Sequence, residues 1–185
     1  MVDELDTVTK LEIYKLVINR YKSLISEKES HSISEIRQRV SPYSDLIKKH
    51  RDAIISDMLP YIPQKHFLMA AQRAMDYVRT IKTCEFSFTF WVDFEEMEKI
   101  KIGTAMDKAI LLAALLRSIE SEDVKVCVTK KGKSYVKFSW DKMQYVFAPE
   151  SGSLLMGDDA LKVFSEDAAA YSFNDLVYEN YEEEG

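Results

Sequence analysis

The chain of 185 residues contains few residues that bend or cross-link a backbone: 5 glycines, 4 prolines and 2 cysteines. Because glycine and proline interrupt helices and strands, their scarcity favours long, regular elements. The cysteines, Cys84 and Cys127, lie 43 positions apart and form no CxxC pair. That pattern is typical of a reduced, cytoplasmic protein, so we expect this localisation. The length suits one domain, or one domain with an added helical segment.

The ionisable side chains argue against several kinds of site. The net charge is −6 and the pI is about 5.2, whereas nucleic-acid surfaces need concentrated Lys and Arg. His31, His50 and His66 are dispersed and lack the i, i+4 spacing of metal ligands. We therefore expect no nucleic-acid partner, no metal and no cofactor. The apolar run near the start is short and interrupted by charge, so we expect no signal peptide and no membrane-spanning helix.

The first 62 residues are predicted to be helical. Ser32 and Glu35 have the spacing of a capping box, which predicts a short helix over residues 34–39. Ser41 and Pro42 have the pattern of an N-cap and a first helical residue, which predicts a third helix to about residue 58. An amphipathic helix is predicted over residues 9–27, where apolar side chains recur at helical spacing: Leu11, Tyr14, Ile18, Tyr21 and Ile25.

Beyond residue 62 the prediction is a mixture of helices and strands. Pro63 begins a helix, "CEFSFTFWV" at 84–92 has an extended or strand-like composition, and residues 93–100 form a short helix. The most apolar helix, over 104–119, is expected to be buried. Three strands separated by hairpin-sized turns predict an antiparallel meander: 123–130, 133–140 and 143–149. A helix at 157–164 and a strand at 168–173 precede an acidic tail.

A helix that begins against an antiparallel sheet is a geometry suited to a cysteine nucleophile. The helix dipole stabilises a thiolate at the first turn, a His on a neighbouring strand removes its proton, and an Asp orients the His. In "KIGTAMDKAILLAALLRS", the position expected for the nucleophile is occupied by Ala105. The sequence therefore poses the question of whether this site is active.

Residues 103–118, "GTAMDKAILLAALLRS", resemble the nucleophile helix of transglutaminase-like proteins, especially archaeal and bacterial ones, with the pattern G-D-C-E-D-K-A and then L-L-A-S-L-L-R. "KSYVKFSWDKMQYVFAP" is similar to the family strand pair, H-x-W/Y-V-E-V followed by W-Y-V-x-D-P. Trp91 resembles the tryptophan that precedes the nucleophile segment, and "YSFND" at 171–175 is similar to the closing segment. The resemblance covers residues 69–175. The helix matches are Gly103, Asp107, Lys108, Ala109, Leu111, Leu112, Leu115, Leu116 and Arg117, and the strand matches are Tyr135, Val136, Tyr145, Val146 and Pro149.

The resemblance implies an α+β fold with a papain-like or transglutaminase-like core, in which a buried helix packs against an antiparallel sheet. That core would span residues 63–178, preceded by a helical N-terminal segment, 1–62, and followed by an acidic tail, 179–185. The family positions for Cys, His and Asp are occupied by Ala105, by Lys133 (or Ser134 if the register shifts by one) and by Ala148. A methyl group cannot attack a carbonyl, and Ala148 cannot orient a base. We therefore predict a catalytically inactive member of the family.

The sequence leaves three hypotheses for the function. An inactive member would act as a binding or scaffolding module that holds a protein or peptide in the former substrate groove, at Trp91, Ala105, Lys133, Ser134 and Ala148. Alternatively, a cysteine-protease-like hydrolase or acyltransferase would use a relocated residue: Cys127, Ser134 or Lys133. A third interpretation is self-association of the N-terminal amphipathic helices.

A tryptophan, a cysteine and a group of lysines each have two interpretations. Trp91 would line the groove or belong to the core, and Cys127 would be a functional thiol or a passive small residue in a strand. The lysines of the predicted hairpin indicate either a solvated face or a site for an anionic ligand: Lys125, Lys130, Lys131, Lys133 and Lys137.

Overall fold

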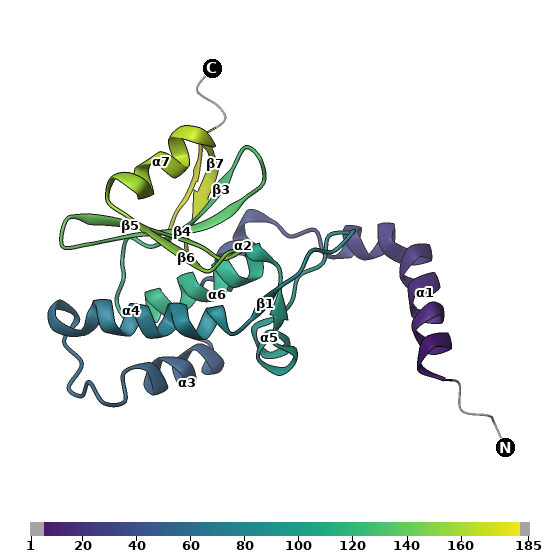
Figure 1. Cartoon of the computed structure of the whole chain (residues 1–185), viewed down its shortest axis with the longest axis horizontal. Coiled ribbons are helices and arrows are strands. Elements are labelled where there is room, and N and C mark those ends of the chain that lie inside the picture. The colour runs from purple at the N-terminus through teal and green to yellow at the C-terminus, as the bar shows by residue number, and fades with distance from the viewer. Residues whose placement is uncertain (1–5, 182–185) are drawn as a thin grey trace. The chain divides into compact units, whose positions relative to one another are not determined.

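The computed structural model describes residues 6–181, which contain seven helices and eight strands in an α+β arrangement (Figure 1). The helices are α1 (Thr7–Lys28), α2 (Ile33–Arg39), α3 (Asp45–Ile54), α4 (Pro63–Arg79), α5 (Phe94–Ile100), α6 (Ala105–Ser118) and α7 (Asp158–Glu166). The strands are β1 (Lys82–Thr83), β2 (Ile102–Gly103), β3 (Lys125–Thr129), β4 (Ser134–Trp140), β5 (Met143–Ala148), β6 (Ser153–Met156), β7 (Ala169–Phe173) and β8 (Tyr178–Asn180).

The chain divides into two compact units, one within Met1–His31 and Phe86–Trp91 and the other within Ser32–Glu85 and Val92–Gly185. In the first unit, α1 has no buried residue and is capped by the Asp6 carboxylate. Trp91 lies against the end of this helix. Its backbone N–H donates to the Glu29 carboxylate at 3.2 Å, its indole N–H donates to the Glu29 carbonyl at 3.0 Å, and its ring meets the His31 ring edge-on.

The second unit is built on a six-stranded antiparallel sheet with the strand order β6-β5-β4-β3-β7-β8. The predicted meander of β3, β4 and β5 is confirmed, with Val126 opposite Val136 and Val136 opposite Phe147. The short outer strands β6 and β8 were not predicted. The separate pair β1 and β2 is parallel, and β2 leads directly into the N-cap of α6.

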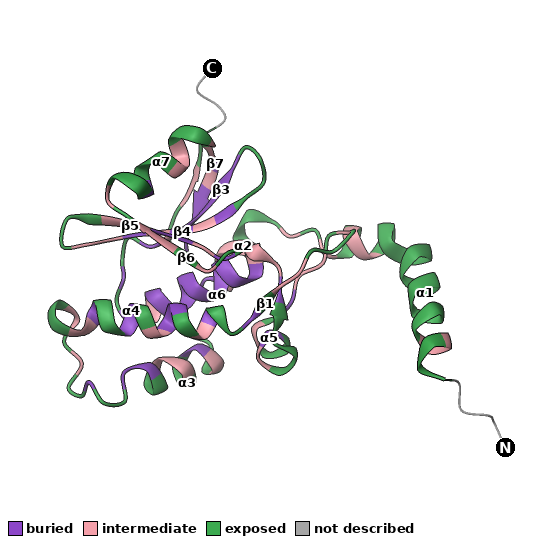
Figure 2. Ribbon diagram, viewed as in Figure 1, coloured by how far each residue is buried: buried purple, intermediate pink, exposed green. Residues whose placement is uncertain are grey.

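Helix α6 is the buried centre of the second unit, as the sequence predicted. Every residue from Asp107 to Leu116 is buried, and Figure 2 shows this helix as the main buried helical segment. One side of α6 packs against β3 and β4, and the other side packs against α3 and α4. Helix α7 contacts β5 and β6 and covers the opposite face of the sheet (Figure 1).

The start of α3 corrects the sequence-based prediction. Ser41 and Pro42 do not begin the helix. The Ser41 hydroxyl instead accepts a hydrogen bond from the Tyr43 N–H within a turn, and Ser44 becomes the N-cap. Its hydroxyl accepts from the Ile47 N–H at 3.3 Å. The helix ends at Ile54, before the predicted residue 58. Both positions carry a serine with a suitable acceptor, so the local pattern did not distinguish them.

The compact units also differ from the predicted division at residue 62. Helices α2 and α3 belong to the same unit as the sheet, whereas α1 forms a unit with residues 86–91. At the other end, Glu179 and Asn180 of the predicted acidic tail form part of β8, and residues 182–185 of that tail lie outside the described part of the chain. No helix within residues 6–181 combines the length and the apolar character required to cross a bilayer.

The central position of α6 predicts a large effect of truncation. Leu112 is fully buried, so Leu112→Ala is expected to lower the free energy of unfolding by about 2–5 kcal/mol through lost burial and a residual cavity. The matched control is Leu176→Ala, because the Leu176 side chain is 62% exposed, and a change below about 0.5 kcal/mol is expected there. Urea unfolding measures both, and equal losses would contradict the central role of α6.

Candidate functional site

The start of α6 is closed by its own capping residues. Thr104 is the N-cap, and its hydroxyl accepts a hydrogen bond from the Asp107 N–H at 3.1 Å. The Asp107 carboxylate in turn accepts from the Thr104 N–H at 3.0 Å and from the Thr104 hydroxyl at 2.7 Å. Ala105 is the first helical residue and is half-buried. The positive end of the helix dipole therefore already faces a carboxylate of the same helix.

Two ionisable residues, Asp107 and Lys108, are buried beside this cap, with 2% and 3% of their surfaces exposed. Burial raises the pKa of Asp107 and lowers the pKa of Lys108, since it disfavours both charged forms. The Lys108 ammonium donates to the Thr83 hydroxyl at 2.8 Å. That hydroxyl lies 3.4 Å from the Pro149 carbonyl oxygen and 3.3 Å from that of Glu150. Lys108 thus links α6 to β1 and to the turn after β5.

Ser134, rather than Lys133, lies at the start of α6. The Ser134 hydroxyl is buried and donates a weak hydrogen bond to the Met106 sulfur at 3.7 Å. Lys133 is an exposed turn residue whose backbone pairs with Thr129. Because successive side chains of a strand point to opposite faces, the one-residue shift that the sequence left open decides which residue meets the helix. Of the two residues, the structure shows Ser134 in contact with α6, through Met106.

Ala148 lies on the other face of the sheet from Ser134. Val136 is opposite Phe147, and Ser134 shares the face of Val136 because the two are separated by two positions. Phe147 is therefore on the α6 side, and Ala148 faces away from it. Trp91 belongs to the first compact unit, where it contacts Glu29 and His31. Of the five predicted groove residues, Ala105 and Ser134 lie at the start of α6. Lys133 and Ala148 do not, and Trp91 belongs to the other compact unit.

The sheet face turned away from α6 carries a cavity of about 520 Å³. The sequence grouped Lys125 and Lys137 with the other hairpin lysines, as either a solvated face or a site for an anionic ligand, and alternation in β3 and β4 places these two and Cys127 on one face. The cavity also requires α7, β7 and Tyr181 after β8, which no local pattern connects to these strands. Its lining residues are Asp123, Lys125, Cys127, Lys137, Ser139, Gln144, Leu161, Phe164, Ala169, Ser172 and Tyr181.

Cys127 in this cavity is an unreactive thiol. It is 5% exposed, and burial raises the pKa of Cys127 to about 11. Lys137 and Lys125 act in the opposite direction, but they do not offset the burial. No imidazole is among the groups that act on the thiol. A nucleophilic cysteine needs a base or a lowered pKa, and Cys127 has neither in the described part of the protein.

Glu179 organises the polar side of the cavity. Its carboxylate accepts hydrogen bonds from the Lys125 ammonium at 2.7 Å, the Tyr181 hydroxyl at 2.6 Å and the Ser172 hydroxyl at 3.3 Å. The Lys125 hydrogen bond is the main reason that the pKa of Glu179 is lowered. Glu179 is therefore ionised at neutral pH and already satisfied by three donors.

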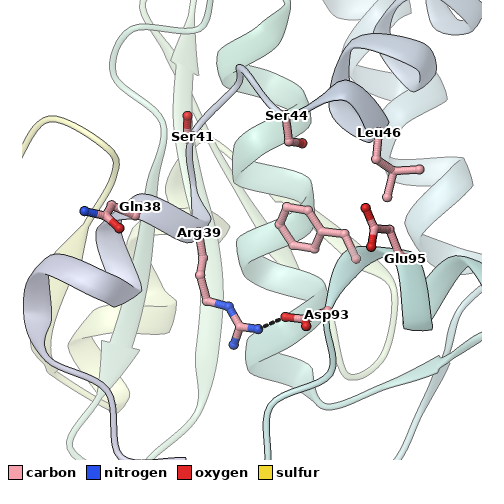
Figure 3. Close-up of a pocket in the computed structure, with 8 residues that line it drawn as sticks. Gln38, Arg39, Ser41, Ser44, Leu46, Asp93 and Glu95 are labelled. Carbon is pink, nitrogen blue, oxygen red and sulfur yellow. Dashed lines mark hydrogen bonds and ion pairs between the residues drawn. The ribbon is translucent and has the colours of Figure 1, made fainter.

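A second cavity, of about 280 Å³, lies between α2, α3 and the start of α5 (Figure 3). Figure 3 shows Arg39 and Asp93 pointing toward one another, and they form an ion pair. Asp93 is also the N-cap of α5, in a capping box with Glu96. Arg39 and Asp93 are thus engaged in joining α2 to α5, so this smaller cavity is the weaker candidate for a ligand site.

The histidines occupy separate places that suit packing. The His50 ring lies tilted against the Tyr77 ring, with the centroids 4.2 Å apart, and its Nε2 is 3.3 Å from the Glu98 carboxylate. Burial lowers the pKa of His50. The His66 imidazole accepts a hydrogen bond from the Ile62 N–H at 3.1 Å. Within residues 6–181, no three His, Cys, Asp or Glu side chains are grouped so that they could hold a metal ion.

The raised pKa of Cys127 predicts slow alkylation. At pH 8, a thiol with a pKa near 11 is ionised to about one part in a thousand, so iodoacetamide should modify Cys127 roughly a hundredfold more slowly than an exposed cysteine. The rate should rise about tenfold per pH unit toward pH 11. Peptide mass spectrometry after timed labelling measures the rate, and a cysteine placed at exposed Lys133 (Lys133→Cys) is the control. Equal rates at the two positions would contradict the closed environment of Cys127.

No protein-family model matches the chain, and neither a curated protein nor a solved structure is significantly similar to it. The resemblance to transglutaminase-like proteins therefore stays a prediction from the residues of α6 and of the β4–β5 pair.

Proposed function

We propose that this protein is a catalytically inactive, transglutaminase-like binding or scaffolding module with a papain-like core. The observation that carries the proposal is the start of α6. There, Ala105 presents a methyl group, and the helix cap is closed by hydrogen bonds between Thr104 and Asp107. The hydroxyl of Ser134, from β4, is hydrogen-bonded to the thioether of Met106. Ala105 cannot act as a nucleophile, and the hydroxyl of Ser134 donates to a thioether rather than to a base.

The geometry does not favour a relocated catalytic residue. The Ser134 hydroxyl donates to the Met106 sulfur, which cannot remove a proton from it near neutral pH. Burial holds the pKa of Cys127 near 11. Lys133 lies in an exposed turn between β3 and β4 and lines neither of the two cavities described above. Binding is accordingly the better account of this part of the molecule.

The surface around the start of α6 supports contact with a protein or peptide. Ile100 and Ile102 precede the helix and are 52% and 36% exposed, and Ala105 and Met106 are half-buried beside them. Adjacent exposed apolar side chains are a common component of protein contact sites. Cys84 and Cys127 are free thiols, which supports a reducing compartment such as the cytoplasm.

Turnover assays test the proposal. The wild-type protein, incubated with an amine donor and a glutamine peptide, or with peptide and ester substrates, is expected to give no thiol-dependent product above buffer. Ala105→Cys is expected to remain inactive, because no imidazole lies at the start of α6 to activate the new thiol. Turnover by the wild type that survives purification and is lost in Cys127→Ser or Cys84→Ser would refute the proposal and identify the nucleophile.

Self-association is a second candidate function, and one feature of α1 favours it. The apolar residues Leu11, Tyr14, Ile18 and Tyr21 recur at the three-and-four spacing of a coiled-coil seam. These side chains are 40–61% exposed. A seam of this kind is buried by a second copy of the same helix, since identical registers align in a symmetric dimer.

Sedimentation equilibrium distinguishes a dimer from a monomer. The wild type is expected to sediment at twice 21.4 kDa, and Ile18→Ser should weaken the dimer at least tenfold because it places a hydroxyl in the apolar seam. Leu16→Ser is the matched control, because Leu16 is exposed on the opposite side of α1. A clean wild-type monomer would rule out this candidate function.

A further inference from the structure

The cavity on the sheet face away from α6 has the size and composition of a small-molecule site. Its volume of about 520 Å³ lies within the range of about 300–1,000 Å³ that is usual for such sites. The cavity is separate from the start of α6, because α6 packs against the other face of β3 and β4. Its role is therefore independent of the proposed function.

The cavity contains two opposed lysines. Lys125 of β3 and Lys137 of β4 are directly opposite one another in the antiparallel ladder. Like charges in this position destabilise a sheet unless other groups compensate them. Lys125 is compensated by Glu179, at 2.7 Å. The Lys137 ammonium lies 6.0 Å from the centre of the Phe164 ring, and within residues 6–181 it forms no ion pair with a carboxylate.

The remaining carboxylates leave Lys137 available to a ligand. Glu179 already accepts hydrogen bonds from Lys125, Ser172 and Tyr181. Asp123 is exposed, precedes β3 and also lines the cavity. An anionic group beside Lys137 would pair with its ammonium, and no described carboxylate does so.

The other walls suit an apolar body. Leu161 and Phe164 of α7 line one side, with Ala169 and Cys127 also contributing apolar surface. Ser139 and Gln144, which are opposite one another on β4 and β5, add hydrogen-bonding groups on the same face as Lys137. A positive group beside an aromatic wall selects a ligand that is anionic at one end and apolar at the other.

We propose that this cavity binds a small organic carboxylate with an apolar or aromatic body. The carboxylate lies against the Lys137 ammonium, and the body lies along Leu161 and Phe164 of α7. Lys137 supplies the selectivity for the anion, whereas the apolar wall supplies much of the affinity.

Calorimetric titration with phenylbutyrate and with its uncharged analogue phenylbutanol tests the proposal. The wild type should bind phenylbutyrate saturably and more tightly than phenylbutanol. Lys137→Met, which keeps the aliphatic stem but removes the charge, should weaken phenylbutyrate about tenfold, or about 1.4 kcal/mol, and change phenylbutanol less than twofold. Lys133→Met is the matched control, because this exposed lysine lies in the β3–β4 turn and does not line the cavity; it should leave both affinities unchanged.

Two further measurements place the ligand in this cavity. Saturating phenylbutyrate should slow the alkylation of Cys127 at least fivefold and leave that of Cys84 unchanged, because only Cys127 lines the cavity. Leu161→Glu, at a side chain that is 56% exposed and tolerant of a polar replacement, should weaken phenylbutyrate by adding a negative charge to the wall. This variant carries the test if Lys137→Met does not fold.

Three outcomes would overturn the proposal: no saturable binding of phenylbutyrate, equal binding of phenylbutanol, or equal loss of affinity in Lys133→Met and Lys137→Met. Protection of Cys84 in place of Cys127 would also overturn it, because the carboxylate would then occupy another surface.

Discussion

The burial of α6 is the constraint on which the second compact unit depends. A helix that is apolar on every side must be covered on every side, because an apolar side left exposed to water would lose its hydrophobic stabilisation. The sheet covers one side through β3 and β4, and α3 and α4 cover the other. The packing of β3, β4, α3 and α4 around α6 follows from this requirement.

The polar groups at the two ends of α6 tie it to the elements that form the candidate sites. At its start, Lys108 reaches Thr83. At its end, Arg117 forms a largely buried, two-point ion pair with Asp175, at 2.6 and 3.2 Å. Asp175 follows β7, and the neighbouring Asn174 donates to the Val124 carbonyl before β3. The position of β7 and β8, and hence of Glu179, is set by this end of the helix.

The two faces of the sheet have different chemistry for one geometric reason. Alternation along β3 and β4 directs Val126, Val136 and Ser134 toward α6, and Lys125, Cys127 and Lys137 toward α7. The first face is apolar because it belongs to the core. The second face can hold lysines because α7 covers it only in part and leaves a cavity. The proposed binding site on the second face is therefore compatible with a core packed against the first.

Elements with local signals could be predicted from the sequence. The helices over 63–79 and 105–118 and the meander of β3, β4 and β5 were predicted because periodicity, caps and short turns specify them. The strands β6 and β8 are short and are held by pairing, so only the tertiary structure revealed them. It also decided between Lys133 and Ser134, because a one-residue shift moves a strand residue to the other face of the sheet. The cavity was likewise a tertiary feature: its lysines lie on β3 and β4, and its apolar wall comes from α7, which the chain brings across them only when it folds.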